Sequence, residues 1–392
     1  MFHLLKNANV FAPEPLGIRD ILVCAGKIVK VGQKLAELDS SLQVQERDLQ
    51  GQRVIPGLID GHVHITGGGG EAGASTRVPP IPLGRFTRAG VTTVVGLLGT
   101  DDLTRNTSSL ITTVRGLREE GLTAYCYTGG YHVPPATLTG SVRSDIVHID
   151  CIIGLGELAL SDHRSSQPTF DELLRLASEA HVAGLMTGKA GIAHLHMGDG
   201  ERGLSMVRQA LKESELPPRV FNPSHVNRKK ALFEEACELS KQGFAIDVTA
   251  FPLEEGEDAW SAADALQRYL DQDFPADRIT ISSDAGGCLP LFDRQGELLS
   301  MDFGKSQALI KTLKELLDSG CDLARVLPAF TSNVARLLRF HRKGRIAEGK
   351  DADFVALDDS HQITDVMANG KWHVADKKQI VYGTFEEKSI EH

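Results

Sequence analysis

The sequence contains little cysteine and no long hydrophobic run. Its six cysteines among 392 residues are scattered, which argues against both a disulfide framework and a cysteine-type zinc site. No stretch of about 18 apolar residues occurs, so no membrane-spanning helix is predicted. The first 20 residues lack the long apolar core of a signal peptide. We therefore expect a cytoplasmic protein.

The chain also carries fewer basic than acidic residues. Lys and Arg together number 42 and Asp and Glu 52, a formal charge of −10. This balance argues against nucleic acid or an anionic membrane as a partner, because both attract a basic face. It leaves room for a small anionic substrate held by a few local arginines. The length is sufficient for one barrel of about 250 residues plus a smaller domain.

Eight apolar segments alternate with longer amphipathic stretches after residue 56. The helical stretches include 109–121, 169–184 and 228–243, each with apolar residues at three- and four-residue spacing and a terminal glycine, followed by 304–320 and 322–340. Repeated strand–helix units favour an α/β fold, a closed (β/α)8 TIM-like barrel, over a doubly wound sheet. The predicted strands are 57–64, 91–98, 123–130, 151–160, 191–199, 219–226, 244–251 and 278–287.

Both ends of the chain have β character instead. Residues 21–32 form two β-rich runs around Ala25-Gly26, which is typical of a hairpin. The tail returns to short strands with tight turns over 344–359 and 366–378. We expect one small β-sandwich domain built from residues 1–55 and 341–388, flanking a barrel of residues 56–340.

Histidines and carboxylates stand near the carboxyl ends of five predicted strands, the end where barrel active sites lie. These are ligand types for zinc or a similar divalent metal. One histidine at a strand end is more often a satisfied polar residue than a ligand, but residues from five strands together favour a metal centre. The residues are His62, His64, Glu157, His194, His196, His225 and Asp284.

The segment "GLIDGHVH" (57–64) resembles the signature of the amidohydrolase superfamily, metal-dependent hydrolases on a (β/α)8 barrel with a flanking β-sandwich. Over almost its whole length the chain is similar to bacterial isoaspartyl (β-aspartyl) dipeptidases. The resemblance implies hydrolysis of β-aspartyl dipeptides by a hydroxide between two divalent metal ions, with zinc expected. The other matching segments include "GGGGEAG" (67–73), "YHVP" (131–134), "SDHRS" (161–165), "HMGD" (196–199) and "HVNR" (225–228).

The same resemblance implies roles for the metal ligands. His62 and His64 would bind the more buried ion, and His196 and His225 the second. Asp284 would touch the first ion, act as general base and pass the proton to the leaving amine. His194 is expected to support the site or belong to the core.

Glu157 departs from the family pattern. Many relatives bridge the two metals with a strand-four lysine that carries a carbamate, and this chain has a glutamate there. Lys189 is no substitute, because it precedes strand five near the opposite mouth. Our hypothesis is that Glu157 bridges directly with its own carboxylate, although it is shorter than a carbamylated lysine. The rival interpretation is a mononuclear or weakened second site.

Substrate recognition follows from the charges of a β-aspartyl dipeptide, which has one amino group and two carboxylates. The resemblance implies that Glu71 pairs with the amino group and that Arg164 and Arg228 pair with carboxylate. Tyr131 would hydrogen-bond the scissile carbonyl and the oxyanion formed from it. Without the family, each of these residues reads more simply as a surface charge or a packed ring.

Further contacts are expected from Thr100 and from backbone amides near Gly69, where glycine lets N–H groups approach a carboxylate closely. Cys288 is a second departure, because relatives read roughly "SSDGNGS" where this chain reads "SSDAGGC" (282–288). A thiol is a weak donor. The change is either a tolerated replacement or a shift in specificity.

Two alternatives remain open beside the dipeptidase. One is an amidohydrolase acting on another N-acyl acidic amino acid or on a cyclic amide, for which Glu157 and Cys288 leave room. The other is a non-catalytic barrel of the same family, against which the full ligand set argues. Relatives form large homo-oligomers, octamers among them, so the resemblance implies self-association; neither nucleic acid nor a membrane is expected as a partner.

Overall fold

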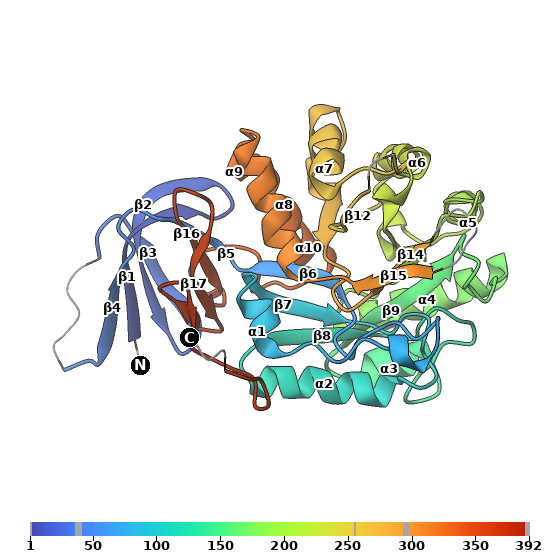
Figure 1. The fold of residues 1–392 in the computed structure, drawn as a ribbon, viewed down its shortest axis with the longest axis horizontal. Coiled ribbons are helices and arrows are strands. Elements are labelled where there is room, and N and C mark those ends of the chain that lie inside the picture. Colours follow the sequence, from blue (N-terminus) through green and yellow to red (C-terminus); the bar gives the residue numbers. More distant parts are fainter. Residues whose placement is uncertain (1, 36–40, 255, 293–297, 389–392) are drawn as a thin grey trace.

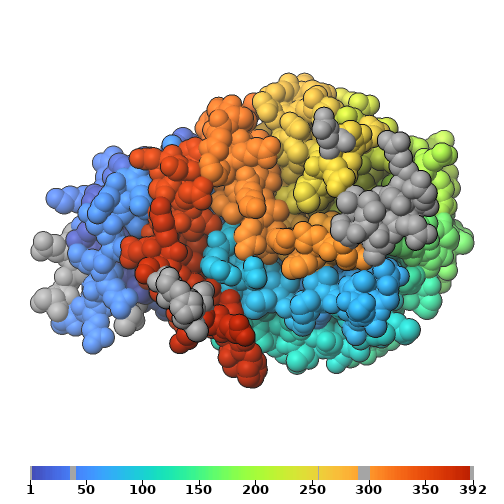
Figure 2. Space-filling model, in the orientation of Figure 1, coloured from blue at the N-terminus to red at the C-terminus, as the bar shows by residue number. Residues whose placement is uncertain are grey.

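The computed structural model describes residues 2–35, 41–254, 256–292 and 298–388. Figure 1 shows a barrel of strands and helices beside a smaller sheet in which the two chain ends lie together. In the space-filling view, the first strands and the last segments form one continuous body against the barrel (Figure 2).

In the described residues, eight parallel strands form the barrel. Hydrogen bonds join β6 to β11 into one parallel sheet and β12 to β13 into a second. A parallel bridge between Val63 and Ala285 links the end of β13 back to β6, which closes the ring on that side. All eight predicted strands are thereby confirmed, with shorter bounds. They are β6 (Leu58–Val63), β7 (Val91–Gly96), β8 (Thr123–Thr128), β9 (Ile152–Leu160), β10 (Ala193–Met197), β11 (Phe221–Ser224), β12 (Ile246–Thr249) and β13 (Ile279–Ser282).

The barrel strands are buried on both faces, as expected for a parallel sheet covered by helices, and buried polar residues such as His62 and Asp247 stand among their apolar ones. Val94 and Ile152 belong to the main core, which includes the apolar faces of the surrounding helices. Their chain neighbours Val95 and Ile153 belong to a separate cluster with Leu338. Because successive side chains of a strand point to opposite faces, the second cluster fills the other side of the sheet.

The helices follow the strands along the chain. None of those in the described residues is long and apolar enough to cross a membrane. Helix α4 runs past its predicted end at Gly184 and stops at Gly188, a left-handed residue at φ 73°. The helices are α1 (Leu83–Thr87), α2 (Thr107–Glu119), α3 (Val142–His148), α4 (Phe170–Thr187), α5 (Ser205–Glu213), α6 (Lys230–Ser240), α7 (Ala262–Asp271), α8 (Gln307–Asp318), α9 (Leu323–Val326) and α10 (Ser332–Leu337).

The single helix predicted over 322–340 is wrong. Helix α9 ends at Val326, a 3-10 turn covers Leu327–Phe330, and α10 begins at Ser332. Pro328 lies in the turn and has no backbone N–H to donate to a helical hydrogen bond. Thr331 then takes φ −137° and ψ −87°, which interrupts the helical path.

The smaller sheet joins the two ends of the chain. Its strands follow the order β19-β18-β17-β16-β5-β1-β2-β3, with β4 paired to β1, so hydrogen bonds link them into one mixed sheet. The ends meet where β5 pairs antiparallel with β16. The division of the chain at 55/56 and 340/341 stays a prediction. The strands are β1 (Phe2–Phe11), β2 (Pro15–Cys24), β3 (Lys27–Gly32), β4 (Val44–Asp48), β5 (Arg53–Pro56), β16 (Phe354–Leu357), β17 (Ile363–Ala368), β18 (Lys371–Ala375) and β19 (Lys378–Gln379).

A hairpin after β13 was not predicted from the sequence. Strands β14 (Cys288–Phe292) and β15 (Leu298–Phe303) pair antiparallel, with Cys288 opposite Phe303. The hairpin begins four residues after Asp284. It therefore carries Cys288 to the same end of the barrel as the carboxyl end of β13.

Candidate active site

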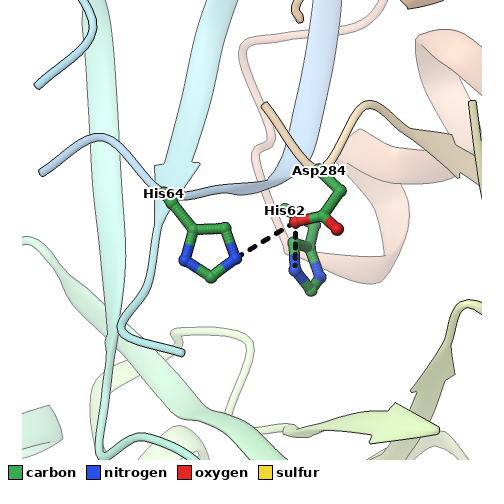
Figure 3. A group of neighbouring side chains, drawn as sticks. All are labelled: His62, His64 and Asp284. Atoms are coloured by element: carbon green, nitrogen blue, oxygen red, sulfur yellow. Dashed lines mark ion pairs between the residues drawn. The ribbon is translucent and has the colours of Figure 1, made fainter. Parts of the chain in front are cut away.

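Six of the predicted ligand residues converge at the carboxyl ends of the barrel strands. They come from five strands that are far apart in the sequence. Figure 3 shows three of them, His62, His64 and Asp284, pointing toward one another. The residues and their positions are His62 in β6, His64 just after it, Glu157 in β9, His196 in β10, His225 just after β11 and Asp284 two residues after β13.

The first cluster consists of His62, His64 and Asp284, whose ligand atoms all lie within 4.8 Å of one another. The Asp284 Oδ1 atom is 3.4 Å from His62 Nε2 and 3.1 Å from His64 Nε2. Zinc bonds of about 2.0–2.1 Å put neighbouring atoms of a tetrahedral site about 3.3 Å apart. These spacings therefore match the edges of a zinc coordination shell.

Glu157 lies close to two sets of predicted ligands, the first cluster and the pair of His196 and His225. Its Oε1 atom lies 3.4 Å from His64 Nε2, and its Oε2 atom lies 3.3 Å from His62 Nε2. The same Oε2 is 3.5 Å from His225 Nε2 and 3.1 Å from His196 Nδ1. The glutamate side chain is shorter than a carbamylated lysine, but it still reaches both sets, because β9 places its carboxylate between the imidazoles.

Several ligand atoms in this centre are buried without a hydrogen-bond partner: His62 Nε2, His225 Nε2, Glu157 Oε1 and Asp284 Oδ1. A buried polar atom left unpaired costs about 1–3 kcal/mol. Burial alone would raise the pKa of each carboxyl group and lower that of His62, yet their mutual contacts hold the pKa of Glu157 and of Asp284 well below the usual range and that of His62 well above it. The cluster thus favours a positive charge between its carboxylates, and a divalent ion would take the place of the His62 proton. Ionised carboxylates and free imidazole nitrogens are a donor set that fits divalent metal.

A buried hydrogen-bond chain sets which nitrogen of His62 faces the centre. The Asn222 amide donates Nδ2–H to the carbonyl oxygen of Ala245 at 2.8 Å, which turns Oδ1 toward His194. His194 Nδ1 is 2.7 Å from that Oδ1, and His194 Nε2 is 2.8 Å from His62 Nδ1. Each Nδ1–H therefore donates outward and leaves the His62 Nε2 lone pair for a metal. His194 thus contacts His62 on the side away from Glu157 and Asp284, and its supporting role stays a prediction.

Two residues of the centre have an uncommon backbone. His225 adopts φ 60° and Asp284 adopts φ 50°, both in the left-handed region. Such residues are rare outside glycine and cluster at functional sites. His225 Nδ1 is also 2.7 Å from Thr249 Oγ1, so its Nε2 is the nitrogen that faces Glu157.

A pocket opens directly above this centre. His64, His196 and Asp284 are in its wall, whereas His62, Glu157 and His225 lie beneath it. The structure brings every predicted substrate-binding residue to the wall of this one pocket. They are Gly69, Glu71, Thr100, Tyr131, Arg164, Arg228 and Cys288.

Tyr131 lines the pocket, and its hydroxyl lies 2.8 Å from His196 Nδ1. Burial, and then the charge of Glu157, raise the pKa of Tyr131 well above its usual value. The hydroxyl therefore keeps its proton and can donate a hydrogen bond. On the same side, Arg228 Nη1 donates to the Met197 carbonyl oxygen at 3.2 Å, which ties this guanidinium to the end of β10.

Cys288 lines the pocket without behaving as a nucleophile. Burial, followed by the charge of Glu71, raises the pKa of its thiol to about 11. The thiol is therefore protonated near neutral pH, and thiolate is the reactive form of cysteine. Its Sγ contacts Met301 on β15 of the hairpin.

Lys189 lies away from the metal centre. Its Nζ donates to the carbonyl oxygens of Ile146 and Ile149, at 2.5 and 2.6 Å, at the end of α3. This side chain therefore does not reach the space between the imidazoles.

Arg105 is a pocket residue that the sequence analysis missed. Its guanidinium donates to the carbonyl oxygens of Thr66 (3.3 Å), Gly69 (3.4 Å) and Val78 (3.0 Å), and to Asp101 Oδ2 (2.8 Å). It thereby holds the glycine-rich loop in one shape. No motif marks this arginine; only its spacing of four residues from Asp101 could have suggested a local ion pair.

Replacing Arg105 with methionine is expected to raise KM for the substrate about tenfold or more. The apolar chain retains much of the packing but leaves three loop carbonyls without their donor, so the glycine loop loses its set position. Steady-state kinetics checks this. Arg115→Met, at an exposed position on α2, serves as the control and should leave KM unchanged. An unchanged KM in Arg105→Met would contradict the role.

Comparison with known proteins agrees with this fold and site. Residues 53–373 match the amidohydrolase family. A similar solved structure is the crystal structure of the beta-aspartyl dipeptidase from Fervidobacterium islandicum AW-1 in complex with beta-Asp-Leu dipeptide. The two chains share 40% sequence identity and superpose with a TM-score of 0.91, and the match covers 99% of this chain and 100% of that one. Adenine deaminase 2 from Carboxydothermus hydrogenoformans is 25% identical over 97% of this chain, and adenine deaminase from Bacillus pumilus is 27% identical over 93%.

The family match covers residues 53–373, and the chain belongs to the amidohydrolase family; its histidine and carboxylate clusters could hold metal ions. Within that family its full-length similarity is to the beta-aspartyl dipeptidase of Fervidobacterium islandicum. The chain spans only 59% and 56% of the length of the two adenine deaminases.

Proposed function

We propose that this protein is a metal-dependent dipeptidase that hydrolyses β-aspartyl dipeptides and holds two divalent ions, most simply Zn²⁺. The observation that carries the proposal is the position of Glu157, whose two oxygens contact the imidazoles of both ligand sets. The relative at 40% identity is a beta-aspartyl dipeptidase in complex with beta-Asp-Leu, which supports the choice of substrate.

The charges of the pocket suit this substrate. A β-aspartyl dipeptide has one ammonium group and two carboxylates. Glu71 supplies one negative charge at the wall, and Arg164 and Arg228 supply two guanidinium groups. Arg164 Nη1 and Glu71 Oε1 are 3.8 Å apart, too far for a hydrogen bond. Both side chains therefore retain bonding capacity for a ligand that carries both charges.

The metal ions would be held by His62, His64 and Asp284 on one side and by His196 and His225 on the other, with Glu157 between them. When bound, such ions lower the pKa of water and polarise a carbonyl group. Asp284 is the chain's own proton carrier, because its carboxylate stands both in the first cluster and in the pocket wall. The Tyr131 hydroxyl donates a hydrogen bond to the carbonyl oxygen on which negative charge develops and keeps its proton.

The first test compares β-Asp-Leu with α-Asp-Leu on zinc-loaded protein. We expect rapid cleavage of the β-linked peptide, little cleavage of the α-linked one, and loss of activity after treatment with a chelator, restored by added zinc. The α-linked peptide is the matched control, because it has the same atoms and charges. Absence of β-Asp-Leu turnover with metal present would contradict the proposal, and turnover of a cyclic amide instead would favour the alternative amidohydrolase.

A further inference from the structure

Asp162 is a buried carboxylate that the proposed function does not use. It follows β9 by two residues, and its side chain is 2% exposed. Arg164 donates to it three times, from Nε–H to Oδ1 (3.0 Å), from Nη2–H to Oδ2 (2.8 Å) and from its backbone N–H to Oδ1 (2.8 Å). A fourth contact comes from His196, whose Nε2 lies 3.0 Å from Oδ2. One carboxylate thus joins a recognition residue to a metal ligand.

The contact with His196 selects one form of that imidazole. An ionised carboxylate only accepts hydrogen bonds, and His196 has one on each side, Asp162 Oδ2 at Nε2 and Glu157 Oε2 at Nδ1. With Glu157 and Nδ1 both turned to a metal ion, as the proposed function requires, the proton of the imidazole stays on Nε2 and is donated to Asp162. The guanidinium groups of Arg228 (3.2 Å) and Arg164 (3.5 Å) also lie near this nitrogen, but they are donors and cannot accept its proton. The lone pair of His196 then stands on Nδ1, the atom 3.1 Å from Glu157 Oε2.

The contact with Arg164 selects which edge of the guanidinium faces the pocket. Asp162 takes Nε–H and one Nη2–H. This leaves the Nη1 hydrogens and the second Nη2–H, a pair of parallel donors suited to a carboxylate. The guanidinium also lies 5.5 Å from the centre of the Tyr131 ring, and Nη1 is on the side of Glu71. The remaining edge therefore lies in the pocket.

The loop around Asp162 has ties of its own that do not use the carboxylate. Ser165 Oγ donates to the Ala159 carbonyl oxygen at 2.6 Å, and Gln167 donates to the backbone oxygen of Asp162 at 2.8 Å. Gly200 N–H donates to the Ser161 carbonyl oxygen at 2.8 Å. The fold of the loop is thus held separately, and the carboxylate is left to orient Arg164 and His196.

We propose that Asp162 is a positioning residue with two roles. It fixes which nitrogen of His196 is free to bind the second metal ion, and it orients Arg164 toward a substrate carboxylate. The inference rests on the proposed function, because it assumes that His196 holds metal and that Arg164 binds substrate. It predicts that metal retention and substrate recognition change together when this one side chain is altered.

The test replaces Asp162 with asparagine, which keeps the size but turns one acceptor into a donor. Zinc affinity is measured without substrate, by competition with a chelating dye, and KM with β-Asp-Leu. We expect the weaker zinc site to lose affinity about 10- to 100-fold and KM to rise about tenfold or more. Asp199→Asn, an exposed residue just beyond β10, is the control and should match the wild type in both.

Arg164→Met separates the two effects. It should raise KM while zinc affinity stays at the wild-type value, because the contact between Asp162 and His196 is retained. At saturating zinc, where the variants carry the same metal, KM of the double variant should rise no further than in Arg164→Met alone, since Asp162 then acts on KM only through Arg164. Asp162→Glu keeps the charge but displaces it, and should change both readouts in the same direction if the asparagine variant does not fold.

A change in only one readout, or in neither, would overturn the inference. An additive rise of KM in the double variant would also overturn it, because Asp162 would then act on substrate by another route. Failure of the proposed function gives a different result: wild-type protein would not cleave β-Asp-Leu, while the zinc competition would still report on Asp162 and His196.

Discussion

Replacing Asp284 with asparagine is expected to lower kcat for β-Asp-Leu about 10³-fold or more. Asparagine preserves the shape of the side chain and one oxygen at the position 3.1 Å from His64 Nε2, but it cannot take up a proton. A positioned general base contributes about 10²- to 10⁴-fold, and loss of a charged ligand adds to that effect. KM should change less, because Glu71 and the arginines of the pocket remain.

The measurement is kcat and KM at saturating zinc, with zinc content recorded on the same preparation. Asp302→Asn, on the exposed face of β15, is the matched control and should retain full activity. Because His62 and His64 hold the pKa of Asp284 well below its usual range despite burial, the fold favours the charged carboxylate. The stability of the variant is therefore measured beside its activity. A kcat within tenfold of the wild type, at full zinc content, would show that another group carries the proton.

Much of this site could be predicted from residue type and position alone. The eight strands were recognisable because each is a short segment rich in apolar residues and buried on both faces, a pattern that depends on the nearest neighbours in the chain. Histidines two residues apart, such as His62 and His64, share one side of a strand. Residues at the carboxyl ends of barrel strands meet at one mouth, so their convergence followed once the barrel was predicted.

The residues that were missed act through contacts between distant segments. Arg105 binds carbonyl oxygens of a loop more than 25 residues earlier in the sequence, and its target is backbone, which has no sequence signal. Asp162 lies inside a recognised segment, but its link to His196 depends on how β9 and β10 pair.

Two local features were also beyond the sequence patterns. The break at Pro328 was overlooked because the apolar spacing of a helix continues on both sides of it. The β14–β15 hairpin was overlooked because it follows a barrel strand, where a helix was expected. In both cases the hydrophobic pattern was compatible with a helix, and backbone chemistry or tertiary pairing decided otherwise.

Replacing Glu157 with glutamine is expected to reduce bound zinc from about two ions to about one per chain. The amide oxygen can still serve as a ligand for one metal ion. The NH₂ group cannot bind the other ion, because it is a hydrogen-bond donor that faces the imidazole nitrogens. The glutamine side chain thus has one oxygen where the carboxylate has two, and it cannot serve both the His62–His64–Asp284 set and the His196–His225 set. The second ion therefore loses the ligand that the two sets share. Activity toward β-Asp-Leu should fall about 10³-fold or more with it.

The decisive readout is metal content after zinc loading and removal of free ion, measured together with kcat/KM. Glu157→Asp is the matched variant: it keeps the charge, but its side chain is one methylene shorter and its carboxylate should reach only one ligand set, so zinc content should also fall.

Wild-type activity should be unaffected when carbon dioxide is removed, because the carboxylate is already part of the side chain. Two firmly bound zinc ions in Glu157→Gln would contradict bridging. One ion in the wild type itself would instead favour the mononuclear site, in which the contacts of Glu157 with His196 and His225 serve to orient those imidazoles.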